Sequence, residues 1–159
     1  MKRIIPLSFV IVFCLSALSC TSMKSRHIVG LEQVLTEKDL SQESVWKMGN
    51  DVFLVRRMDD NTLMAAAMDW NNHTQTYSVV SYPLVVSKLG EYTFLNIKDG
   101  DLFTILRLVG AEGGAVVLLS VDSDMIETDM EAGRINAQKD DQAFIFSGSK
   151  AQLDRYIET

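Results

Sequence analysis

The segment from Thr76 to Asp122 constrains the fold more than any other, because it has the pattern of four consecutive β-strands. These runs are rich in Val, Ile, Leu, Phe and Tyr, and they cover Thr76–Lys88, Tyr92–Lys98, Leu102–Val109 and Ala115–Val121. Leu89-Gly90, Asp99-Gly100 and the Gly-rich residues 110–114 separate them, and Asp-Gly between apolar runs is a strong hairpin signal. The segment therefore predicts an antiparallel meander.

The last two runs are apolar at almost every position, whereas a sheet with one solvated face alternates more cleanly. We therefore expect this sheet to be covered on both faces, either by its own closure into a barrel or by helices. Pro83 interrupts the first run and cannot donate to a ladder, so it marks a bend, a bulge or an edge. Upstream, Val52–Val55 and Thr62–Trp70 predict a further hairpin around a turn rich in Asp and Asn.

Two short helices are expected near the C-terminus. Asp122 or Ser123 can cap the first, and Gly133 can end it. Ser149 and Gln152 have the spacing of a capping box for the second. With Ala143–Phe146 as a last strand, the fold class is mainly β (β-rich α+β): a small antiparallel curled sheet or a lipocalin-like barrel with two short helices. The alternative is an open α+β sheet with both helices on one face.

The first twenty residues have the pattern of an export signal. A positive start at Met1–Arg3 precedes an apolar stretch to Leu18 that is too short to span a membrane. The closing Ala17-Leu18-Ser19-Cys20 resembles a bacterial lipoprotein signal, and the body is similar in layout to small lipocalin-like lipoproteins. The resemblance implies a signal peptide over 1–19, lipidation of Cys20, a tether to residue 30 and one β-rich domain over 31–159. The alternative is plain secretory cleavage at the same bond.

Charge and cysteine content exclude several classes of function. Loss of residues 1–19 leaves 13 of the 15 Lys and Arg residues against all 21 acidic residues, a formal net charge of −8. Such a body repels nucleic acid and anionic lipid headgroups, so no nucleic-acid partner is expected and membrane contact must come through the N-terminal lipid anchor. The two cysteines, Cys14 and Cys20, leave no thiol in the body for a disulfide or a metal.

No catalytic constellation, metal site or cofactor motif is predicted. His73 lies in an Asn-rich turn without a second ligand at metal-binding spacing. Ser147-Gly-Ser-Lys150 matches S-x-x-K by spelling, but the other motifs of that enzyme family are missing. Met64 and Met68 are candidates for an apolar pocket, since methionine lines adaptable cavities, although an ordinary core also explains them.

The sequence therefore favours a non-enzymatic, lipid-anchored envelope protein that binds an envelope protein partner or a small apolar ligand. By the resemblance to bacterial lipoproteins, Thr21 after the cysteine implies that the protein is located at the outer membrane and faces the periplasm. The alternative is a secreted or periplasmic hydrolase with a dispersed site. A continuous internal cavity would favour the ligand carrier, an exposed apolar patch the protein partner, and a cleft gathering Asp69, Asp99 and Asp101 the enzyme.

We predict that mass spectrometry of the processed N-terminus finds acyl groups on Cys20. Cys20→Ser should move the protein from the membrane fraction to the aqueous fraction, because the acidic body has no basic face to hold it at a bilayer. An unmodified Cys20, or a wild-type protein that leaves the membrane without detergent, contradicts the lipoprotein interpretation.

Overall fold

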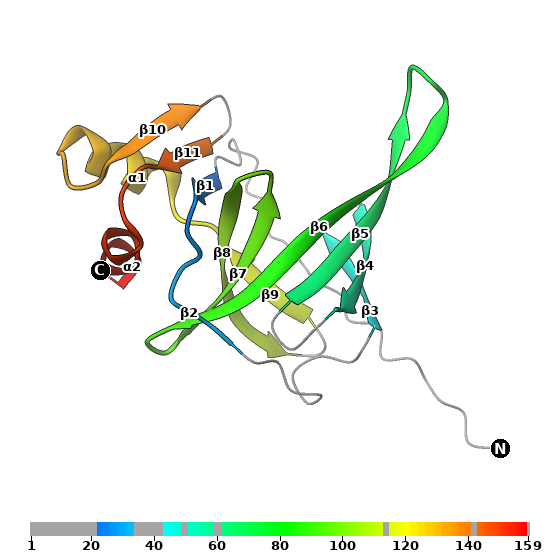
Figure 1. Cartoon of the computed structure of the whole chain (residues 1–159), viewed down its shortest axis with the longest axis horizontal. Helices are drawn as coiled ribbons and strands as arrows, with labels where there is room; N and C mark the ends of the chain where they lie inside the picture. Colours follow the sequence, from blue (N-terminus) through cyan, green and yellow to red (C-terminus); the bar gives the residue numbers. More distant parts are fainter. Residues whose placement is uncertain are drawn as a thin grey trace.

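The computed structural model describes residues 22–33, 43–48, 51–58, 62–112, 115–140 and 143–158 (Figure 1). These residues form one sheet of eleven strands and two helices. The strands are β1 (Ser22–Ser25), β2 (Leu31–Glu32), β3 (Glu43–Met48), β4 (Asp51–Arg57), β5 (Thr62–Asn71), β6 (Thr76–Leu89), β7 (Tyr92–Asp99), β8 (Leu102–Glu112), β9 (Ala115–Leu119), β10 (Ala137–Asp140) and β11 (Ala143–Phe146). The helices are α1 (Ser123–Glu131) and α2 (Lys150–Glu158).

The predicted meander is confirmed. Strands β4 to β9 follow one another as antiparallel neighbours, and their bounds lie within three residues of the expected ones. Only the Gly-rich stretch differs, because β8 continues through Glu112 with an irregularity between Val109 and Ala111 instead of ending before a five-residue loop. Gly110 falls at this irregularity, as glycine often does at bulges.

The sheet is curled but open, so the barrel alternative is wrong. The strand order is β10-β11-β1-β8-β7-β6-β5-β4-β3, and within the described residues the two end strands β10 and β3 do not pair with each other. Two short strands lie off this path, since β2 pairs with β6 and β9 pairs with β8. The long strands β6 and β8 thus exchange partners along one edge. On β6, β5 pairs as far as Val85 and β2 pairs at Ser87 and Lys88.

Both faces of the central strands are buried, as their apolar pattern predicts. On the first face the curled sheet packs on itself, and its cluster comprises Val55, Leu63, Ala65, Leu84, Val86, Leu95, Leu106 and Leu118. On the second face the helices and the N-terminal segment pack against the sheet, around Met23, Val29, Phe94, Ile105, Ile126, Ile135, Phe144, Phe146 and Leu153. Because successive side chains of a strand point to opposite faces, the same strands contribute residues to two separate cores.

The two helices begin as expected. Asp122 Oδ1 accepts the backbone N–H groups of Asp124 and Met125 at the start of α1. The Ser149 N–H donates to Gln152 Oε1 over 2.8 Å, and the Gln152 N–H lies 3.4 Å from Ser149 Oγ, which is the predicted capping box of α2. Each helix buries one apolar residue completely, Ile126 in α1 and Leu153 in α2. The caps thus fix where each helix meets the second core.

The tether expected up to residue 30 differs from the structure. Residues 22–25 form β1, which pairs in parallel with β11 and antiparallel with β8. Met23 and Val29 are completely buried in the second core, so hydrophobic burial holds this segment in the body. The polar residues around Met23 concealed a strand too short to show a periodic pattern. Cys20 itself lies outside the described residues.

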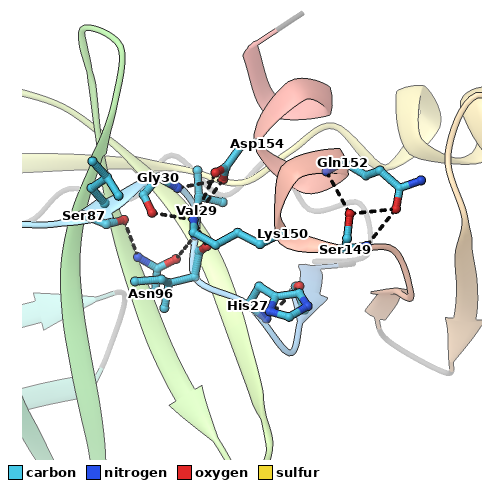
Figure 2. Close-up of polar contacts among 12 residues, drawn as sticks. His27, Val29, Gly30, Ser87, Asn96, Ser149, Lys150, Gln152 and Asp154 are labelled. Carbon is cyan, nitrogen blue, oxygen red and sulfur yellow. Dashed lines mark hydrogen bonds and ion pairs between the residues drawn. The ribbon is translucent and has the colours of Figure 1, made fainter.

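A cluster of polar contacts fastens the chain after β1 to the sheet and to α2 (Figure 2). The buried Asn96 accepts the Val29 N–H through Oδ1 over 3.1 Å, and its Nδ2 donates to Ser87 Oγ over 2.8 Å and to Val85 O.

From α2, Lys150 Nζ donates to the Ile28 and Gly30 carbonyl oxygens and to Asp154, whose Oδ1 also accepts the Gly30 N–H over 2.8 Å. These contacts satisfy backbone groups that no ladder pairs.

We predict that Gly30→Ala destabilises the fold by about 3 kcal/mol or more. Gly30 has φ +66°, and an added Cβ would lie 2.2 Å from the Lys88 carbonyl oxygen, which is rigid backbone. Gly90→Ala is the matched control, because its φ is +57° but nothing lies within 4 Å of the added Cβ. That change should cost only about 1–2 kcal/mol in urea unfolding. Equal costs would show that the close approach at Gly30 is not rigid.

Candidate interaction surface

The second face of the sheet is covered over only part of its width. Ser87, Phe94 and Asn96 point from this face into the buried region under α2 and the N-terminal segment. Val79 lies eight residues before Ser87 on the same strand, so alternation places it on the same face. Its exposed fraction is 72%, whereas that of Ser87 is 0%. The cover therefore ends along β6.

The uncovered part of this face is largely apolar, although the exposed Arg56 and Ser81 also lie on it. In the register Met68 lies opposite Val79, Leu54 lies opposite Ala66, and Val45 lies opposite Leu54, so these side chains share one face. Six of its large apolar residues are between 49% and 72% exposed: Val45, Val52, Leu54, Met68, Tyr77 and Val79. We call these six the bare apolar face. Half-buried Met64 and Pro83 lie beyond Ala66 and Ser81 on the same face and extend the surface.

The hairpin of β5 and β6 carries half of the bare apolar face away from the body. Figure 1 shows it projecting at the end of the molecule opposite α1, α2, β10 and β11. Residues 72–79 are all exposed, and Gln75 adopts φ 52° in the turn. The opposite face of this hairpin is buried at Leu63, Ala65 and Leu84 near its base. The base of the hairpin therefore packs against the first core through one face, while the other face of the hairpin is exposed to solvent.

The predicted site residues have different outcomes. Met68 belongs to the bare apolar face and is 67% exposed, and Met64 lies beside that face. Neither lines the pocket of about 230 Å³ that lies between the sheet and the helices, so the pocket expected from them stays a prediction. Lipidation of Cys20 also stays a prediction, because Cys20 lies outside the described residues.

Val45, Val52, Leu54, Tyr77 and Val79 were missed as a set. Their alternation was visible in each strand, but only the register shows that they share a surface.

Of the carboxylates named for a hydrolase, Asp99 and Asp101 do not line the described pocket, and the side chain of Asp69 lies outside the described part of the chain. Asp99 pairs with Lys24 over 2.9 Å, and Asp101 is exposed in the β7–β8 turn. Lys150, the last residue of the S-x-x-K match, donates through Nζ to the carbonyl oxygens of Ile28 and Gly30. Within the ranges that the structure describes, no group of three His, Cys, Asp or Glu residues is placed to hold a metal ion.

Tyr156 of α2 packs at the edge of the second core. Burial, and next a hydrogen bond with Asp129, raise the pKa of Tyr156 above its usual value, so its phenol stays protonated at neutral pH. A neutral phenol bound to a carboxylate is an ordinary structural pair.

No protein-family model, curated protein or solved structure matches this chain. Among the described residues, neither helix has the length and apolar character needed to cross a bilayer. Function must therefore be argued from the surface and contacts of this chain alone.

We predict that replacing valine by threonine lowers the stability of the fold on one face of β6 and leaves it almost unchanged on the other. Val79→Thr should change the free energy of unfolding by no more than about 0.5 kcal/mol, since the side chain is 72% exposed. Val86→Thr puts a hydroxyl into the first core, where Val86 is 8% exposed, and should cost about 1–3 kcal/mol. Urea unfolding at low protein concentration measures both, and a large cost at Val79 would mean that this face is packed.

Proposed function

We propose that this protein is a non-enzymatic, lipid-anchored component of the bacterial cell envelope that works by binding protein through the bare apolar face. The observation that carries the proposal is the row of six exposed apolar side chains in register across four neighbouring strands. Monomeric proteins rarely leave a contiguous apolar patch of more than a few hundred Å² in water.

The occupant that the surface fits best is a second copy of this chain. Exposed side chains of this size offer on the order of 100 Å² each, so the face supplies roughly 600 Å². A standard interface buries about 800 Å² per partner, which the adjacent Met64, Ala66 and Pro83 bring within reach. None of the six residues carries a charge, and the exposed Arg56 opposite Met64 would lie at the rim of the contact. Two sheets packed face to face supply the geometry.

The lipid anchor places this surface close to a membrane. Acylation of Cys20 would leave Thr21 as the one residue between the anchor and β1 at Ser22. Two residues of extended chain reach about 7 Å, so the body would lie against the bilayer surface. Copies confined to one membrane meet at a higher effective concentration than copies in solution, which favours a modest interface. This arrangement supports the proposal of an envelope assembly, and the resemblance implies the outer membrane facing the periplasm as its location.

A cross-linking experiment tests the proposal. Val79→Cys supplies a thiol on the bare apolar face in a mature chain whose Cys20 sulfur is acylated and whose leader has been removed. A bismaleimide added to cells should give an adduct of twice the chain mass, because the face lies against its copy. Gln138→Cys is the control, since it is exposed on β10 at the other end of the sheet.

Each outcome decides the matter. An adduct of another mass would show that the partner on this face is a different envelope protein and not a second copy. Cross-linking no stronger than at position 138 would contradict the docking surface.

A further inference from the structure

A pocket of about 230 Å³ lies between the second face of the sheet and the two helices. Its floor is formed by Tyr92, Phe94 and Ile105 of the sheet, and Met125 of α1 and Ile157 of α2 form part of its wall. These side chains are apolar or aromatic. The pocket lies outside the bare apolar face and takes no part in the contact proposed above.

The pocket contains one cation, and one of its donor atoms has no partner among the described residues. Arg107 of β8 lines it, and the Arg107 guanidinium carbon lies 3.6 Å from the centroid of the Tyr92 ring. The Arg107 Nε is buried and has no hydrogen-bond partner within the described part of the chain. A buried donor without an acceptor costs about 1–3 kcal/mol. Because water cannot reach this Nε, a ligand in the pocket would meet the other nitrogens of the guanidinium.

One oxygen of the carboxylate that lines the pocket is already engaged. Asp122 also lines the pocket, but its Oδ1 accepts the N–H groups of Asp124 and Met125 at the start of α1. Stacking on Tyr92 holds the guanidinium plane in place, which prepares it for a planar or tetrahedral anion. The arrangement combines an apolar wall with one oriented cation.

We propose that this pocket binds a small amphipathic anion, whose carboxylate or phosphate head pairs with Arg107 and whose short apolar body lies against Phe94 and Ile105. At about 30 Å³ per water molecule, the pocket holds the volume of roughly eight waters. A six-carbon carboxylic acid has eight non-hydrogen atoms and fits this space. Longer acyl chains must leave the pocket through its open side.

Titration of hexanoate into the intact Cys20→Ser chain, followed by calorimetry or by NMR shifts, tests the proposal. We expect saturable binding of hexanoate. 1-Hexanol, an uncharged compound with a six-carbon chain, should bind at least tenfold more weakly. Arg107→Met should also weaken hexanoate binding at least tenfold, because hydrogen bonds to a charged group are worth about 1.5–3 kcal/mol. Lys98→Met is the control, since it removes one exposed cation of the same sheet and should leave binding unchanged.

Hexyl phosphate in place of hexanoate separates the two head groups, and the tighter of the two identifies the natural class. If Arg107→Met does not fold, Met125→Trp at the pocket wall provides a second variant that should block binding, as Met125 is 48% exposed. Equal binding of hexanoate and hexanol, or no saturation with hexanoate, overturns the proposal. The Val79→Cys cross-link is independent of this pocket, so either proposal can fail alone.

Discussion

Hydrophobic burial on both sides of one set of strands is the constraint on which the rest of the structure depends. Strands β6, β7 and β8 send Val86, Leu95 and Leu106 to one core and Phe94 and Ile105 to another. A single sheet cannot bury both of these sets by lying against one layer. The sheet curls on itself to cover the first face, and the helices with the N-terminal segment cover the second. The sheet is therefore curled because it covers its own first face, and it stays open because the helices and the N-terminal segment cover the second.

The second core also explains why the two ends of the chain depend on each other. Met23 and Val29 enter it from the N-terminal segment, and Leu153 enters it from α2. The contacts of Lys150 and Asp154 with the backbone of residues 28–30 then join these two segments directly, as Figure 2 shows. If Cys20 carries an acyl chain, the anchor is attached almost directly to this core. Any force on the anchor would be transmitted to the body without an intervening flexible tether.

Much of the fold could be predicted from local patterns. The meander, its Asp-Gly turn and both helix caps depend on residues within a few positions of each other, and these predictions are confirmed. The strand β1 could not be predicted, because four residues around Met23 show no period and are fixed by distant partners in β8 and β11. Sheet closure was also beyond reach, since it depends on whether β3 and β10 meet.

The candidate sites divide in the same way. Met64 and Met68 were singled out by residue type, and the register then placed them among residues from β3, β4 and β6 that no local pattern joins to them. Arg107 was missed because an arginine inside an apolar strand gives no signal of what covers it. The resemblance to lipoprotein signals concerns only the first twenty residues, and lipidation of Cys20 remains a prediction.

Sedimentation equilibrium of the Cys20→Ser chain tests the central claim, that the uncovered half of the second face is an interface between copies. The account predicts a concentration-dependent dimer at micromolar protein. Leu54→Glu with Val79→Glu should reduce it to monomer, because two copies would then bury like charges, whereas Gln138→Glu should leave it dimeric. A monomer at every concentration, or a dimer that the paired Glu substitutions do not disturb, would contradict the account.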